Sequence, residues 1–141
     1  MEELNTIDIE GNECRFQYVI EYGDVLNPHE VTFKVFSIPQ DPMRWFSYRL
    51  NIIDDQTAKG EMMTTNSCAE FAKKGIPERI IEKAAEKLER NIISSPTIAQ
   101  EGDYLVGPSY SVWLRLTEQN DSASLDEENH RFILLYQVVN N

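Results

Sequence analysis

The chain has 141 residues, of which 41% are hydrophobic, and 24 acidic against 13 basic side chains give a formal net charge of −11. This globular composition and length predict a single domain over residues 1–141 with an apolar core of its own. The acidic excess argues against binding to nucleic acid, whose phosphates attract lysine and arginine. No apolar run approaches the roughly 20 residues that a membrane helix needs.

The cysteines and the N-terminal segment indicate a cytoplasmic protein. The first residues lack the basic and apolar regions of a secretory signal. Cys14 and Cys68 are the two cysteines, with no CxxC pair and no zinc-ligand spacing, so no metal site is expected. Two free thiols in a reducing compartment are the prediction. The alternative is a nucleophilic Cys68, which would need His29 or His130 as its partner.

Alternating polar and apolar residues predict strands throughout the first half of the chain, because the side chains of a strand point to opposite faces in turn. A short strand is expected at residues 6–10, before a turn at Gly11-Asn12. Four further segments show the alternation more clearly, and these are residues 16–22, 31–35, 45–53 and 58–64. Turn-forming pairs such as Gly23-Asp24 and Asn27-Pro28 separate them.

The second half opens with the period of a helix. Apolar residues recur along one stripe from Ile80 to Leu88, which predicts a helix over residues 77–90. Pro77 suits the first helical turn, where its missing N–H costs nothing. Asn91 is expected to end the helix.

The remaining residues predict one more helix between two strands. Ile92-Ile93 indicates a brief strand, and residues 97–107 a polar loop. A second helix is expected to start near residues 108–109. Its buried side chains are expected to be Val112, Trp113 and Leu116. Residues 119–129 are acidic and are expected to be irregular, whereas alternation predicts a closing strand over residues 132–138.

This order of elements predicts the fold class. Several antiparallel strands are followed by helix, strand, helix and strand. A strand–helix–strand unit implies at least one parallel pair, joined here to an antiparallel sheet. The prediction is an α/β (α+β) domain whose mixed, mostly antiparallel sheet carries two main helices in the C-terminal half.

Residues 71–90 are the cationic segment of this acidic chain, with six basic against four acidic side chains. They include the run Lys73-Lys74-Gly75-Ile76-Pro77 at the start of the predicted helix. A glycine turn at a helix N-terminus presents free N–H groups and the positive end of the helix dipole, and two lysines beside it would suit a phosphate. The alternative is that Gly75 only makes a turn and that the charges form a solvated face with pairs such as Glu86–Arg90.

Three runs of residues resemble the second half of GNAT-type N-acetyltransferases. They are Lys73-Lys74-Gly75-Ile76-Pro77-Glu78-Arg79-Ile80-Ile81, Asn91-Ile92-Ile93-Ser94-Ser95 and Val112-Trp113-Leu114-Arg115-Leu116. In that family an antiparallel sheet leads into a loop of pattern Gln/Arg-x-x-Gly-x-Gly/Ala, a helix, a splayed strand and a second helix, and the loop and helix bind the pyrophosphate of acetyl-CoA. The likeness covers about residues 44–138. It implies a GNAT-like fold and acetyl-CoA or CoA as the cofactor. The cofactor-binding residues that it implies are Lys73, Lys74, Gly75 and Ile76.

The chain departs from the family pattern at several positions, and a degenerate cofactor site is therefore expected. Ala72 takes the Gln/Arg position of the loop, and Pro77 replaces the second Gly/Ala and removes an N–H donor. Trp113 stands where the family often has a tyrosine acid. Tyr104 and Tyr110 are candidates to replace that acid, or else aromatic packing residues. The first half also lacks the pair of helices that the family has after its first strand.

Two classes of function follow from these features. The first is an acyl-CoA-dependent N-acyltransferase with weak or no activity toward a small-molecule amine; Glu61 and Glu70 are candidate bases, and no catalytic residue is assigned. The second is a non-catalytic, acidic, cytoplasmic module that binds a protein or a small ligand. A third, an acidic decoy for nucleic-acid-binding proteins, follows from net charge alone.

Overall fold

The computed structural model describes residues 1–98, 102, 103, 105 and 107–137, apart from the side chain of Cys68. The elements are β1 (Glu2–Ile7), β2 (Glu13–Tyr22), β3 (Glu30–Ser37), β4 (Phe46–Ile52), β5 (Thr57–Thr65), α1 (Cys68–Phe71), α2 (Ile76–Leu88), β6 (Asn91–Ile93), α3 (Gly107–Gln119), β7 (Ala123–Asp126) and β8 (Arg131–Leu134). None of the described helices is long and apolar enough to span a bilayer.

The described strands form one eight-stranded sheet in the order β1-β2-β3-β4-β5-β6-β8-β7. The pair β5/β6 is parallel, and the other neighbouring pairs are antiparallel. A parallel pair needs a crossover connection, which α2 supplies. Two helices of 13 residues each, α2 and α3, lie in the C-terminal half. The predicted mixed, mostly antiparallel α+β sheet with two main helices is confirmed.

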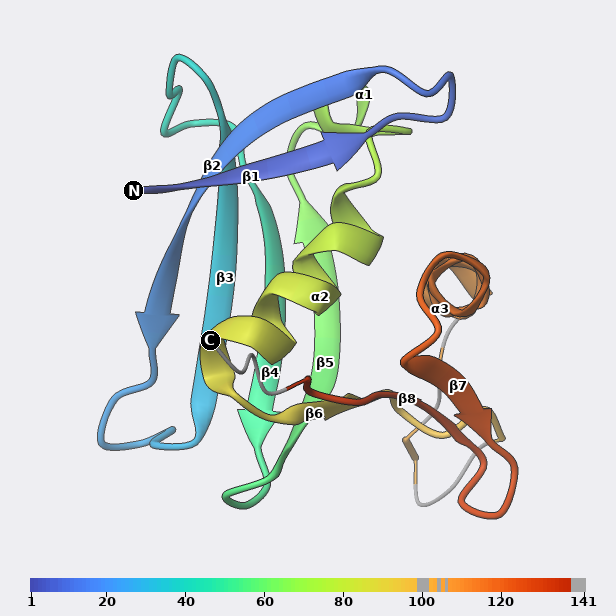
Figure 1. Cartoon of the computed structure of the whole chain (residues 1–141). Coiled ribbons are helices and arrows are strands. Elements are labelled where there is room, and N and C mark those ends of the chain that lie inside the picture. The colour runs from blue at the N-terminus through green and yellow to red at the C-terminus, as the bar shows by residue number, and fades with distance from the viewer. Residues whose placement is uncertain (99–101, 104, 106, 138–141) are drawn as a thin grey trace.

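Helix α2 covers one face of the sheet, in front of β3 to β5 (Figure 1). The apolar stripe predicted from the sequence faces the core, and Ile80, Ile81 and Ala84 are fully buried there. The predicted stop at Asn91 is wrong. Glu89 takes a left-handed conformation with φ of 52° and its N–H bonds to the carbonyl of Ala85, so the helix ends before Asn91 becomes the first residue of β6.

Helix α3 lies beside α2 and extends the same core. It begins at Gly107 and buries Val112, Trp113 and Leu116, as the sequence predicts. Trp113 stacks on Phe132 of β8 with ring centroids 5.8 Å apart. The side chains of α2, α3 and the covered sheet face therefore form one apolar cluster.

The structure corrects four of the sequence expectations. The first strand covers Glu2–Ile7 rather than residues 6–10; its inward positions are Leu4 and a threonine, Thr6, so the alternation is faint. Residues 119–129 are not wholly irregular, because β7 pairs with β8. The four-residue helix α1 was not expected. The closing strand β8 ends at Leu134, and position 138 lies outside the described residues.

Candidate functional site

Strands β5 and β6 run side by side only briefly and then part. Their pairing covers three residue pairs and ends at Lys59 opposite Ile93. Beyond that point β5 continues to Thr65, whereas the chain after β6 turns toward β8, where the N–H of Ser94 donates to the carbonyl of Phe132 at 3.0 Å. From Gly60 onward, the edge of β5 that faces away from β4 consequently has no described strand beside it.

A hollow of about 260 Å³, the small hollow, lies between this edge of β5 and helix α3. Its lining comes from β4, β5, the turn after β6, and α3. The lining residues are Tyr48, Gly60, Glu61, Met62, Met63, Ser94, Ser95, Leu105, Ser109, Val112 and Trp113. The interior is mainly apolar, and it contains a few hydroxyl groups and one carboxylate.

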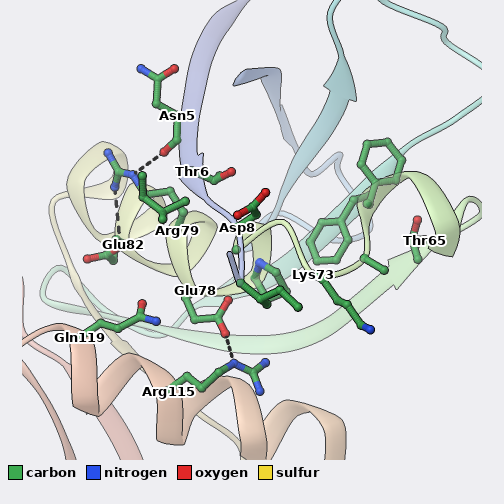
Figure 2. A pocket seen from close by; sticks show the side chains of 17 residues that line it. Asn5, Thr6, Asp8, Thr65, Lys73, Glu78, Arg79, Glu82, Arg115 and Gln119 are labelled. Carbon is green, nitrogen blue, oxygen red and sulfur yellow. Dashed lines mark hydrogen bonds and ion pairs between the residues drawn. The ribbon is translucent and has the colours of Figure 1, made fainter. Parts of the chain in front are cut away.

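A second and larger cavity, of about 830 Å³, lies at the N-terminal end of α2 (Figure 2). Its walls are the end of β1 with the following turn, the loop between α1 and α2, the first turns of α2, and helix α3. Strand β5 and helix α3 contribute residues to both hollows. Thr65 and Arg115 line the large cavity, and Met63 and Val112 line the small hollow. The two hollows therefore follow one another along these two elements.

Charges in the large cavity are balanced and largely paired. Arg115 of α3 donates from Nε to the carboxylate of Glu78, which is buried in the first turn of α2. Arg79 donates to the carbonyl of Asn5 at 3.3 Å and lies 3.9 Å from Glu82 (Figure 2). Two of the three basic side chains that line the cavity, Arg79 and Arg115, are thus paired with acidic residues.

The two lysines of the predicted phosphate-binding loop differ in their placement. Lys73 lines the large cavity, takes φ of 58°, and projects away from the Glu78–Arg115 ion pair (Figure 2). Lys74 is half-buried and does not line the cavity. It lies near Asp8, whose pKa is held below its usual range first by the N–H of Asn12 and to a smaller extent by Lys74.

The other two predicted residues of this loop are held by the core. Gly75 is the N-cap of α2 with φ of 76°, and a Cβ added there would lie 2.4 Å from the carbonyl oxygen of Ile7. The side chain of Ile76 is fully buried, so only its backbone can face a ligand. A helix N-terminus offers backbone N–H groups to anions, and Pro77 removes one of them here.

The two candidate bases lie in different places. Glu61 lines the small hollow. Glu70 accepts hydrogen bonds from the hydroxyls of Ser37 and Ser67 and lies 3.6 Å from Arg44, so these neighbours occupy its carboxylate. Of the two, only Glu61 is placed to face a ligand in either hollow.

The aromatic residues that the sequence singled out as possible acids, or in the place of one, differ in their surroundings. Trp113 lines the hollow, and Tyr110 packs edge-on against Phe132, as an aromatic packing residue would. Tyr104 lies outside the described residues. Tyr48 is a lining residue that the sequence did not single out, because its place in an alternating strand indicated only a core position. Burial, with Glu61 adding a smaller effect, raises the pKa of Tyr48 above its ordinary value, so its hydroxyl stays protonated.

Cys14, His29 and His130 line neither of the two hollows. Cys14 is a free thiol whose Sγ lies 3.9 Å from Asp8, and His29 and His130 are exposed. The side chain of Cys68 is outside the described part of the chain. Across the described residues, no group of three or more His, Cys, Asp or Glu side chains is arranged to hold a metal ion.

Replacing Arg115 with methionine is expected to lower the free energy of unfolding by about 1–3 kcal/mol, because the buried carboxylate of Glu78 then loses its charged donor. Urea unfolding followed by circular dichroism measures the change. The double variant Glu78→Gln/Arg115→Met should recover part of the loss, since no unpaired buried charge remains. An equal loss in the single variant and in the control Arg49→Met, at an exposed arginine, would contradict a structural ion pair.

Comparison of the chain with protein-family models, with curated proteins and with solved structures finds no match in any of the three.

Proposed function

We propose that this chain is a GNAT-like protein that binds CoA or acetyl-CoA weakly at a degenerate site and transfers acetyl groups slowly or not at all. The observation that carries the proposal is the parting of β5 and β6 after Lys59 and Ile93, with the small hollow beside it. In the family that the sequence resembles, such a gap between strands admits the pantetheine arm of the cofactor. A cytoplasmic setting, in which acyl-CoA is available, is part of the proposal.

The order of elements supports the same proposal. An antiparallel sheet from β1 to β5 leads into the Lys73–Pro77 loop, then α2, the parting strand β6 and the second helix α3. The resemblance implies this succession. Because β5 and α3 line both hollows, an extended ligand has one continuous pair of elements to follow, with its phosphates near the loop and its acyl end at the parting strands.

Three features support weak binding and poor catalysis. Pro77 removes an N–H donor at the start of α2. The carboxylate of Glu78 lies in the same helical turn, where it would repel a phosphate at the helix N-terminus, even though Arg115 offsets part of its charge. Trp113 lines the small hollow, and its indole N–H is far too weak an acid to protonate a leaving thiolate.

The second candidate is a non-catalytic, acidic, cytoplasmic module that binds a protein or a small ligand. The paired charges of the large cavity favour it, because Arg79 and Arg115 are already engaged with acidic residues. In this case the cavity would accept a largely uncharged ligand, and added salt would change its affinity little.

Calorimetric titration with CoA tests the proposal. We expect weak binding that falls with added salt and falls at least fivefold in Lys73→Glu/Lys74→Glu. Local donors act at contact distance, whereas distant acidic charge is screened beyond about 8 Å at physiological salt. Lys73→Glu alone should carry most of the loss, because Lys73 lines the large cavity and Lys74 does not.

The matched control is Arg15→Glu/Arg49→Glu, which changes the net charge equally at two exposed positions outside both hollows. Its affinity for CoA should stay within twofold of the wild type. If Lys73→Glu/Lys74→Glu binds CoA as well as the wild type does, or if neither protein binds CoA at millimolar concentration, the cofactor site is refuted and the non-catalytic module remains.

A further inference from the structure

The hydroxyl of Tyr48 is buried at the wall of the small hollow without a hydrogen-bond partner. The side chain is 3% exposed, and its oxygen is one of three buried side-chain polar atoms without a partner in the described part of the chain. A buried hydroxyl that bonds to nothing has lost its water and gained no replacement, so a partner is expected for it. The hollow that this residue lines is where such a partner can enter.

Gly60 and an irregularity of the sheet make room for this hydroxyl. A Cβ added to Gly60 would lie 2.2 Å from the Tyr48 oxygen, so any larger residue would displace the phenol. The β4/β5 register shifts between Arg49 and Leu50, whose partners are Met62 and Gly60, and Glu61 is left as the extra residue of a bulge. Bulges re-aim side chains and occur often beside binding sites. The bulge and the glycine both lie on the wall of the small hollow.

The other residues that line the small hollow indicate which kind of ligand fits it. Met63, Leu105, Val112 and Trp113 give the hollow apolar sides, and about 260 Å³ is room for a short chain of a few carbons. The protonated hydroxyl of Tyr48 offers a donor, which calls for an acceptor oxygen. A small molecule with an apolar body and one acceptor oxygen therefore fits both the walls and the donor.

The charge of the occupant follows from Glu61 and from burial. A carboxylate would meet the charge of Glu61 and the excess acidity of the whole chain. An ammonium group beside Tyr48 would lose its water, and the attraction of Glu61 would offset only part of this loss, because Glu61 is exposed and solvent screens its charge. A neutral carbonyl avoids both costs.

We propose that the small hollow is a binding site for short, neutral carbonyl compounds, and that the hydroxyl of Tyr48 donates a hydrogen bond to their carbonyl oxygen. The site consists of residues other than the Lys73–Ile76 loop, so it does not depend on CoA binding. If the proposed function also holds, the acyl carbonyl of the thioester is the natural group for this position.

Titration of the 15N-labelled protein followed by NMR tests this site with four probes of equal chain length, which are butanamide, butyrate, butylammonium and 1-butanethiol. We expect butanamide to shift the backbone amides of Gly60 and Glu61 and the indole of Trp113, and to bind at least fivefold more tightly than the other three probes. A preference for butyrate or butylammonium, or no shift with butanamide at any soluble concentration, would overturn the proposal.

Tyr48→Phe removes only the hydroxyl, and we expect at least a fivefold loss of butanamide affinity. Its thermal midpoint should not fall, because the deleted group has no partner in the described structure. Tyr22→Phe, at an exposed tyrosine of β2 that does not line the small hollow, is the matched control and should bind as the wild type does. Equal affinity in Tyr48→Phe and the wild type would show that the hydroxyl does not hold the ligand. CoA titration of the same variants separates this result from the fate of the cofactor proposal.

Discussion

Replacing Leu88 with alanine is expected to lower the free energy of unfolding by about 2–5 kcal/mol, the range for truncating a buried leucine. Leu88 is 7% exposed and lies on the stripe of α2 that packs against the sheet. Its removal leaves a cavity at the end of the helix that crosses over between β5 and β6, so the parallel pair loses support as well. Urea unfolding followed by circular dichroism measures the change, with the same dependence of the free energy on urea concentration used for the variant and the wild type.

Glu86→Ala is the matched control for this variant. Glu86 lies two residues earlier on the exposed side of the same helix, where its carboxylate is 56% exposed and pairs with Lys83. Its replacement should change the free energy of unfolding by no more than about 0.5 kcal/mol. If Leu88→Ala costs as little as this control, the stripe from Ile80 to Leu88 does not face the core.

Replacing Gly75 with alanine is expected to lower the free energy of unfolding by about 2–5 kcal/mol, for two physical reasons. A left-handed backbone costs an alanine roughly 1–2 kcal/mol. The added Cβ also lies 2.4 Å from the carbonyl oxygen of Ile7, and forcing β1 away from the loop adds about 1–3 kcal/mol, as overpacking does elsewhere. The same unfolding measurement applies.

The variant Gly11→Ala measures the cost of the left-handed backbone alone. Gly11 also has a positive φ, of 85°, but nothing lies within 4 Å of an added Cβ there. Its substitution should therefore cost only the backbone part, about 1–2 kcal/mol. The difference between the two variants measures the contact between Gly75 and Ile7. Equal costs would mean that the loop moves away from Ile7 freely and that the close approach does not stabilise the fold.

The close approach of Ile7 explains why position 75 is a glycine without any role in phosphate binding. The sequence raised both interpretations of the Lys73–Pro77 run, a phosphate cradle or a turn. The approach of Ile7 explains the glycine by packing alone, so Gly75 by itself does not support a cofactor site. The cofactor proposal depends instead on the parting of β5 and β6 and on Lys73, which CoA titration tests directly.

Much of the fold could be predicted because it is encoded in local periodicity. The helical stripe of α2, the start and buried residues of α3, and four of the first five strands follow from alternation or a helical period within a few residues. The errors fall where local pattern is faint. Strand β1 carries a threonine at an inward position, and β7 forms because β8 is available to pair with it.

The candidate site was only partly predictable. The sequence correctly placed the Lys73–Pro77 loop at the beginning of a helix. Glu61, a candidate base, lines the small hollow, whereas Lys73 and Gly75 of this loop line the large cavity. It could not identify Tyr48, because alternation assigns a strand tyrosine to the core without showing which atom faces its hydroxyl. Gly60 within a strand was the available signal, since a glycine there often marks a bulge or a close approach.

By itself, the sequence of this protein determined the order of its elements apart from α1 and β7, the mixed character of its sheet and the buried faces of its two long helices, because each depends on residues a few positions apart. The tertiary structure alone decided where β5 and β6 part, that Ile7 covers Gly75, that Glu78 pairs with Arg115, and that Tyr48, whose buried hydroxyl has no described partner, lines a hollow beside Gly60. Each of these contacts joins residues far apart in the chain, and strand register and the crossing of α2 and α3 set them. Local periodicity carries no information about either.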